Sequence, residues 1–243
     1  MNILVVGDSC VDVFVYGSIT RMSPEAPVPV IVPLYEKENA GMSGNVAANL
    51  NALGANVKLI TNKQKMRKVR YVDERYNHMV LRVDEGDECE NISTIPTDYS
   101  SYDAVIISDY CKGFLTKEDI VKISNLCECP VFLDTKKKLG PWCECVDFIK
   151  INNFEFENNS DVFERWPHLL ENVIITRGKH GCVYKGRAYD TQEVPVKDVS
   201  GAGDTFISAL VYNFVKSQDI DESINFAQEC TTVVVQKTGV ATI

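Results

Sequence analysis

The sequence lacks several features that would assign it to common protein classes. None of its apolar runs approaches the roughly 18 residues that a membrane-spanning helix needs, and its N-terminus has neither the basic region nor the long apolar core of a signal peptide. Basic residues are not in surplus, because 25 Lys and Arg stand against 34 Asp and Glu, for a formal net charge of -9. The sequence therefore predicts a cytoplasmic protein with no membrane partner. The acidic balance also argues against a nucleic-acid partner, whose phosphates would be bound by Lys and Arg.

Two common nucleotide-binding motifs are also missing. The chain contains no Gly-x-x-x-x-Gly-Lys-Ser/Thr sequence, which excludes the chemistry of a P-loop. No Gly-x-Gly-x-x-Gly follows its first apolar run, which argues against an oxidoreductase that binds a dinucleotide. Any nucleotide site must hold its phosphates in another way.

The nine cysteines are an odd number, and without an export signal they are expected to be reduced thiols. The pairs Cys127/Cys129 and Cys143/Cys145 raise the alternative of a zinc site. Both pairs have the spacing Cys-Glu-Cys, whereas structural zinc sites usually use Cys-x-x-Cys. Free cysteines are the favoured interpretation.

Short apolar runs alternate with helical patterns along the 243 residues, a length that suits one full α/β domain. The apolar runs are residues 3–6, 104–107, 131–133, 148–151 and 173–175. Helical patterns occupy residues 44–53 and 116–126, and the second begins with a Thr-x-x-Asp cap. This alternation predicts a doubly wound, mainly parallel sheet flanked by helices, with ligands at the carboxyl ends of the strands.

Two regions depart from this alternation of strand and helix patterns. Residues 11–36 and 66–84 each show apolar residues at alternate positions on both sides of a turn, which predicts two antiparallel hairpins. We expect them to form a small β lid inserted in a single domain that spans residues 1–243.

The strongest chemical signal is Gly201-Ala202-Gly203-Asp204, which leads into an apolar helix. The glycines allow a tight turn, and amide groups at a helix N-terminus bind anions, here a phosphoryl group on which charge develops. Asp204 lies in the first helical turn, where it can take a proton from an attacking hydroxyl. The alternative is a helix cap containing glycine, with an Asp that matches the helix dipole.

A second signal is Asn152 with Glu155, directly after a predicted strand. An amide and a carboxylate at this spacing can hold Mg²⁺ through its water ligands. The alternative is an ordinary helix start, where Asn and Glu are common.

A third signal is Gly41 and Asn45 at the start of a helix, where the glycine permits close approach and the amide can bond sugar hydroxyls. Asp8 and Asp12, near the end of the first strand, are further hydroxyl acceptors. Helix capping is the alternative.

A basic stretch occupies residues 63–70. Lys68 and Arg70 are candidates to bind a phosphate already present on the substrate. The alternative is a solvated face.

Taken together, these residues resemble the ribokinase-like (PfkB-type) carbohydrate kinases. The resemblance is carried by Val5-Val6-Gly7-Asp8, Asp12, Tyr16-Gly17, Gly44-Asn45-Val46-Ala47, Ser108-Asp109-Tyr110, Lys112-Gly113, Asp134, Lys136, Asn152, Glu155, Thr176-Arg177 and residues 201–205. Within this family, the run Ser-Pro-Glu-Ala-Pro-Val-Pro-Val at residues 23–30 resembles kinases of D-glycero-β-D-manno-heptose 7-phosphate.

The resemblance implies an ATP- and Mg²⁺-dependent kinase that phosphorylates the anomeric hydroxyl of this sugar phosphate. Asp204 would be the catalytic base, with Gly201, Ala202 and Gly203 as the anion hole. The residues implied for ATP and Mg²⁺ are Asn152, Glu155, Thr176, Gly178 and Lys136, of which Asn152 and Glu155 would reach the metal through water. The residues implied for the sugar phosphate are Asp8, Asp12, Gly41, Asn45, Lys68 and Asp109. The hairpins would act as the lid and as the interface of a homodimer.

The sequence departs from the family pattern in three places. A helix–strand portion expected after residues 59–62 is missing, so one edge of the sheet should be trimmed. Gly41-Met42 replaces an expected Gly-Gly pair, and the chain ends at Ile243 without an adenylyltransferase domain. A kinase for another sugar, and a catalytically silent sugar- or nucleotide-binding protein of the same fold, remain as alternatives.

Overall fold

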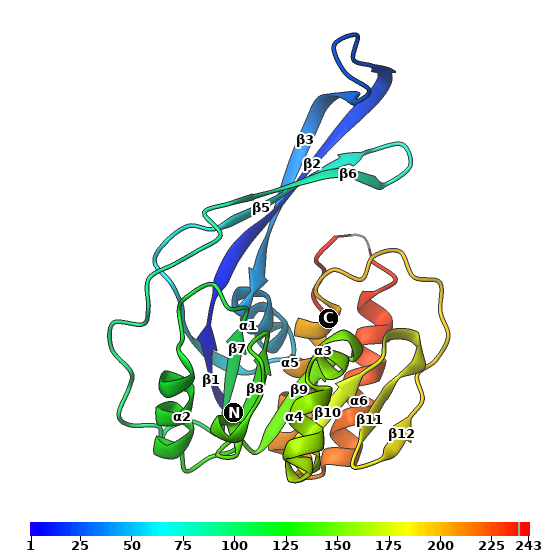
Figure 1. Cartoon of the computed structure of the whole chain (residues 1–243). Coiled ribbons are helices and arrows are strands. Elements are labelled where there is room, and N and C mark those ends of the chain that lie inside the picture. The colour runs from blue at the N-terminus through cyan, green and yellow to red at the C-terminus, as the bar shows by residue number, and fades with distance from the viewer. Residues whose placement is uncertain (238) are drawn as a thin grey trace.

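The main sheet has eight strands in the order β12-β11-β10-β9-β8-β7-β1-β4, in a computed structural model that describes residues 1–237 and 239–243 (Figure 1). The strands are β1 (Asn2–Gly7), β4 (Asn56–Ile60), β7 (Ala104–Asp109), β8 (Val131–Thr135), β9 (Phe148–Asn152), β10 (Val173–Thr176), β11 (Cys182–Tyr184) and β12 (Arg187–Tyr189). The six strands from β4 to β10 pair in parallel, and β11 and β12 add an antiparallel edge. The predicted doubly wound, mainly parallel sheet is confirmed.

Helices cover both faces of this sheet. Helices α1 (Ser43–Ala52), α5 (Ala202–Ser217) and α6 (Ile220–Val234) pack on one face, against side chains such as Ile3 and Val5. Helix α2 (Lys117–Leu126) and the short helices α3 (Asn153–Asn158) and α4 (Ser160–Arg165) belong to the other face, where Leu4 and Val6 are buried. Because both faces are buried, the strands are continuous apolar runs rather than alternating ones.

Short 3₁₀ turns and capped helix starts complete this layer. The 3₁₀ helices are η1 (Pro141–Cys143), η2 (Pro167–Asn172) and η3 (Gly178–His180). Thr116 and Asp119 form the predicted capping box at the start of α2.

A second sheet of four strands, in the order β3-β2-β5-β6, extends away from the main sheet (Figure 1). Its strands are β2 (Ser9–Met22), β3 (Pro29–Met42), β5 (Arg67–Asp73) and β6 (His78–Glu85). The pairs β2/β3 and β5/β6 are antiparallel hairpins, and β2 pairs with β5 in parallel. The first hairpin is longer than the sequence indicated, because its strands continue to residues 9 and 42.

Strand β4 forms one edge of the main sheet. Only residues 61–66 connect it to β5, without an intervening helix or strand. The structure thus has the trimmed edge that the missing helix–strand portion predicted. Within the described residues, no helix combines the length and hydropathy that crossing a membrane requires.

Candidate active site

The start of α5 presents free backbone amides. Gly201 is the N-cap residue and has φ of 81°, a left-handed conformation that favours glycine. The Ala202 N–H donates to the carbonyl of Val199 at 3.2 Å, whereas the amides of Gly203 and Asp204 have no acceptor within the described part of the chain. These groups lie at the positive end of a 16-residue helix, where an anion is stabilised.

Asp204 lies between two hydrogen-bond donors from distant parts of the chain. The Tyr110 hydroxyl donates to one carboxylate oxygen at 2.6 Å, and the Asn45 side-chain amide donates to the other at 2.9 Å. Burial raises the pKa of Asp204 to about 6, although these two hydrogen bonds and the charge of Lys150 act in the opposite direction. Asp204 is 5% exposed, and its pKa of about 6 lies below neutral pH. It is therefore ionised at neutral pH and has a pKa suited to a general base.

Tyr110 is a site residue for which the sequence suggested no role. Burial and the neighbouring Asp204 raise the pKa of Tyr110 well above its ordinary value, so its hydroxyl keeps the proton that it donates. Its signals in the sequence are its place in Ser108-Asp109-Tyr110, which carries part of the family resemblance, and its position directly after the carboxyl end of β7, where ligand sites of parallel sheets occur.

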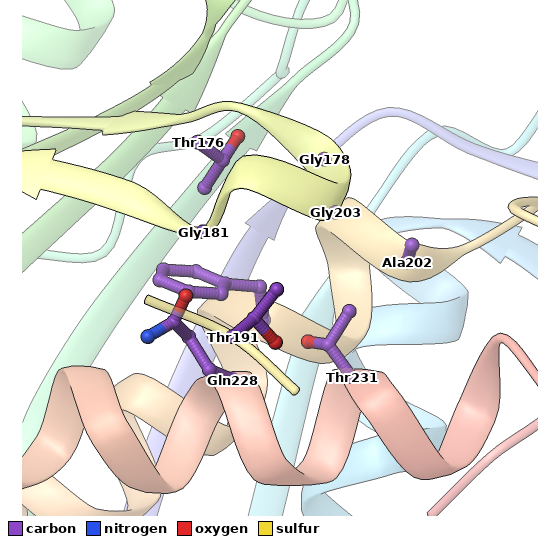
Figure 2. Close-up of a pocket in the computed structure, with 9 residues that line it drawn as sticks. Thr176, Gly178, Gly181, Thr191, Ala202, Gly203, Gln228 and Thr231 are labelled. Carbon is purple, nitrogen blue, oxygen red and sulfur yellow. The ribbon is translucent and has the colours of Figure 1, made fainter. Parts of the chain in front are cut away.

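A pocket of about 120 Å³ opens beside the start of α5 (Figure 2). Its lining residues are Thr176, Gly178, Gly181, Thr191, Ala202, Gly203, Phe206, Gln228 and Thr231. The structure thus brings together four residues that the sequence assigned to nucleotide or phosphate binding, namely Thr176, Gly178, Ala202 and Gly203.

Gln228 on α6 is a second residue that the sequence analysis missed. Its side-chain Nε2 donates to the carbonyl of Asp190 at 3.2 Å, which directs Oε1 the other way. That oxygen is buried and has no hydrogen-bond partner within the described residues. Gln228 and Thr231 both project from α6 into the pocket (Figure 2). A single Gln on an amphipathic helix does not by itself predict that its side chain lines a pocket.

Asn152, Glu155 and Lys136 lie beside this pocket, since Asn152 is in register with Thr176 on the adjacent strand. Asn152 and Glu155 form a capping box at the start of α3, and the other oxygen of Glu155 pairs with Lys136. The helix-start interpretation therefore describes the contacts of Asn152 and Glu155 in this structure. Their role toward a nucleotide stays a proposal.

Three of the residues predicted to bind the sugar lie at the base of the second sheet. Asp12 is buried and forms an ion pair with Arg70. Gly41 packs against it, because an added Cβ would come within 2.2 Å of the Asp12 carboxylate. The Lys68 ammonium lies 5.4 Å from the centre of the Tyr110 ring. Lys68, which is in register with Asp12 on the adjacent strand, therefore lies close to Tyr110, the residue that bonds Asp204.

Met42 occupies a strained position next to Gly41. Its φ of 57° and ψ of -132° form a conformation that side chains rarely adopt. This is the position where the resemblance predicts a second glycine. The Met42 side chain is buried with Cys10 and Met66, and this packing offsets part of the backbone strain.

Asp8 and Asp109 are placed differently from the prediction that they bind sugar hydroxyls. Asp8 is fully buried, and its carboxylate accepts from the backbone amides of Tyr110 at 2.6 Å and Phe114 at 3.3 Å. Asp109 is also buried and accepts from Thr135 and from Lys137. Protein groups engage both carboxylates, and Asp8 holds the loop that carries Tyr110.

Replacing Asp8 with alanine is expected to lower the free energy of unfolding by about 2 to 3 kcal/mol, because it leaves buried amides without an acceptor. Activity should fall through kcat as Tyr110 loses its position, with the KM for sugar changed less. Urea denaturation and steady-state kinetics measure both. Asp98→Ala is the control, since Asp98 also accepts from a backbone amide but is exposed. A raised sugar KM with unchanged stability would instead identify Asp8 as a sugar ligand.

All nine cysteines are free thiols. Within the described residues, no group of three or more His, Cys, Asp or Glu side chains gathers in a way that could hold a metal ion.

Comparison with solved structures identifies the class of fold. The chain superimposes on ribokinase from Thermotoga maritima with a TM-score of 0.71 at 16% identity, covering 98% of this chain and 94% of that one. It superimposes on a Methanocaldococcus jannaschii nucleoside kinase of the ribokinase family with a TM-score of 0.72 at 17% identity, covering 98% and 93%. The fold is that of the ribokinase-like kinases.

The sequence pattern of the pfkB family of carbohydrate kinases matches residues 98–243. The chain belongs to this family and is a sugar kinase, which confirms the resemblance inferred from the sequence.

The chain is also similar in sequence to curated proteins that share one name. The chain is 29% identical over 300 aligned residues to the bifunctional protein HldE of Bradyrhizobium diazoefficiens, covering 100% of this chain and 61% of the relative. It is 30% identical over 292 residues to the bifunctional protein HldE of Nitratiruptor sp., covering 99% and 63%. The chain therefore spans a little over three fifths of the length of these relatives.

Proposed function

We propose that the protein transfers the γ-phosphoryl group of ATP to the anomeric hydroxyl of D-glycero-β-D-manno-heptose 7-phosphate, giving the 1,7-bisphosphate. The observation that carries this proposal is the meeting of Asp204 with the free amides at the start of α5, beside a pocket. The similarity to bifunctional HldE proteins and the run at residues 23–30 support the choice of acceptor.

In this mechanism Asp204 accepts the proton of the sugar hydroxyl as the hydroxyl oxygen bonds to the γ-phosphorus. The bond from that phosphorus to the oxygen bridging it to the β-phosphate breaks, and ADP leaves with the bond's electrons. The amides of Gly203 and Asp204 hold the charge that develops on the transferred group. Positioning and charge stabilisation supply most of the catalysis in such transfers.

The residues present fit a hydrated magnesium ion. Mg²⁺ usually keeps several water ligands and is held by substrate phosphates with one or two carboxylates. The Glu155 side chain is 12% exposed beside the pocket, and one oxygen of Asp134 has no hydrogen-bond partner within the described residues. Asn152 and Glu155 would hold the ion through water, and the ion would neutralise charge on the ATP phosphates, while Thr176 and Gly178 line the nucleotide's pocket.

A basic pocket supports an acceptor that already carries a phosphate. It has a volume of about 270 Å³ and lies between the second sheet and the loop before α5. Arg70, Arg82 and Lys197 contribute to its lining, together with Ser200 next to the anion site. Guanidinium and ammonium groups recognise phosphate well, and here they gather within a protein of net negative charge. In this proposal the second sheet acts as a lid over the sugar phosphate.

The second sheet also supports the proposal of a homodimer formed through the lid. Several of its large apolar side chains are exposed, among them Val32, Leu34, Met79 and Leu81. They lie on β3 and β6, the two edge strands of the second sheet, and exposed apolar side chains on a sheet are typical of an interaction surface.

The test is a screen of acceptors with the wild-type protein and magnesium-ATP, following ADP release. Heptose 7-phosphate, free heptose, hexose phosphates, ribose and nucleosides are compared at equal concentrations. We expect ADP release to be fastest with heptose 7-phosphate. A faster reaction with another sugar would replace the proposed acceptor, and calorimetric binding of sugar and ATP without any ADP would support a silent binding protein.

A further inference from the structure

A buried lysine, Lys150 on β9, reaches the start of α5. The residue is 3% exposed, and its ammonium lies 2.8 Å from one oxygen of Asp134 on β8. A Cβ added to Gly203 would come within 2.9 Å of the Lys150 Nζ. Because Cβ atoms in a helix tilt toward its N-terminus, the ammonium lies beside the first turn of α5, where the free amides of Gly203 and Asp204 are.

The Lys150–Asp134 pair is difficult to explain by stability alone. Removing two charges from water is costly, and an apolar pair of similar volume often stabilises a protein as well or better. Although burial opposes its ionisation, the charges of Lys150 and Lys136 hold the pKa of Asp134 below its ordinary value. Asp134 therefore stays charged, and it holds an ammonium group in a fixed place next to the anion site.

We propose that Lys150 is a catalytic residue, whose ammonium contacts the phosphoryl group during transfer. This inference rests on the phosphoryl transfer proposed above. Lys150 donates hydrogen bonds to oxygens of the migrating group, whose charge it stabilises together with the two amides. It keeps its own protons, since Asp204 takes the proton of the acceptor. Asp134 acts as a positioning residue through its ion pair.

The absence of a side chain at residue 203 fits this role. Any Cβ there would occupy the space next to the Lys150 ammonium. Glycine costs a helix roughly 1 kcal/mol relative to alanine. The sequence thus keeps a weaker helix former where the lysine meets the helix.

The test compares Lys150→Met with Lys150→Arg and the wild type. Lys150→Met is expected to lower kcat by about 10²-fold, the size of effect seen when one donor to a developing negative charge is removed. Affinity for magnesium-ADP, measured by calorimetry, should stay near the wild-type value. Affinity for magnesium-ADP with aluminium fluoride, which mimics the group in transfer, should fall by about as much as kcat. Lys150→Arg retains the charge and should recover part of both losses.

The pH dependence of kcat/KM gives a second measure of how Lys150 acts on the site. Asp134, Lys136, Tyr110 and Asn45 surround Asp204 together with Lys150. Losing the positive charge of Lys150 should raise the pKa of Asp204, so the acidic limb of kcat/KM moves to higher pH in Lys150→Met and stays in place in Lys150→Arg. This contrast would show that the charge of Lys150 acts on Asp204, whereas the aluminium fluoride affinities report contact with the phosphoryl group itself.

Two further variants separate catalysis from folding. Lys137→Met removes another ammonium paired with a buried carboxylate, that of Asp109 at 2.7 Å, and so measures what losing such a pair does to stability. Gly203→Ala leaves Lys150 in the chain but displaces its ammonium, and should lower kcat about tenfold with no loss of helix stability.

Wild-type kcat and aluminium fluoride affinity in both Lys150→Met and Gly203→Ala would overturn the role of Lys150 and leave the proposed function intact. If the wild type releases no ADP with any acceptor, the proposed function fails. The aluminium fluoride affinities then decide the role of Lys150 on their own.

Discussion

Replacing Asp204 with asparagine is expected to lower kcat by about 10²-fold or more and to leave ATP binding nearly unchanged. The amide cannot take the proton of the acceptor, but it fills the same space. Its oxygen can accept from Asn45 and its nitrogen can donate to the Tyr110 oxygen, so both contacts seen in the structure have replacements. Steady-state kinetics and calorimetry with ATP measure the two quantities.

The same variant should be at least as stable as the wild type at pH 7.5. Burial raises the pKa of Asp204 to about 6, so the folded protein binds this proton more tightly than the unfolded chain does. Ionising Asp204 therefore removes folding free energy as the pH rises from about 4 past 6, by up to about 3 kcal/mol. The asparagine variant does not lose this free energy, and urea denaturation at pH 4.5 and 7.5 should show its advantage only at the higher pH.

Wild-type kcat/KM should fall as the pH drops below about 6, where Asp204 becomes protonated. The control is Asp161→Asn, which changes an exposed carboxylate paired with Lys138 on the protein surface. It should alter neither kcat nor its pH profile. Wild-type turnover in Asp204→Asn would refute the role of Asp204 as the base.

The second large effect is expected from Gly201→Ala, which should lower kcat by about 10²-fold. A Cβ at this position would come within 2.7 Å of the Asn45 side-chain nitrogen, the group that donates to Asp204. Asn45 and the turn must then move apart, and displacements of about 1 Å at a catalytic site have effects of this size. Stability should also fall by about 1 to 2 kcal/mol, because φ at this residue is 81°.

Gly54→Ala is a matched control for this prediction. Gly54 also has a positive φ, of 92°, but an added Cβ there would meet no atom within 4 Å. This variant should lose similar stability and keep the wild-type kcat. Equal kcat in the two variants would show that the contact between residue 201 and Asn45 does not matter for catalysis.

Local patterns were sufficient to predict five strands of the main sheet, the two hairpins, helices α1 and α2 and a helix start at residues 201–204, but not β11, β12 or α6. Buried parallel strands are apolar on both faces, so they stand out as short runs, and the glycines next to Asp204 mark a helix start that binds anions. The resemblance to a family added Thr176 and Gly178 as residues proposed to bind the nucleotide, and both line a pocket together with Ala202 and Gly203.

Contacts between distant segments explain what the sequence did not reveal. Tyr110 meets Asp204 across 94 positions of the chain, and a tyrosine after a strand has no pattern that predicts its partner. Asp8 could be recognised as a residue at a strand end. Its contacts with the amides of Tyr110 and Phe114, in the loop after β7, depend on how the sheet is assembled. Lys150 was concealed by its position within an apolar strand, where only the arrangement of β8, β9 and α5 gives it a partner and a role.

The chain crosses between the two sheets almost without loops. Strand β2 begins one residue after β1 ends, and α1 begins directly where β3 ends. Two of the connections that leave the second sheet are therefore continuous with regular elements, rather than flexible loops. Any closing movement of the second sheet must bend and twist these strands elastically, pivoting near Asp8 and Met42, so substrate capture would be resisted by a restoring force that reopens the site.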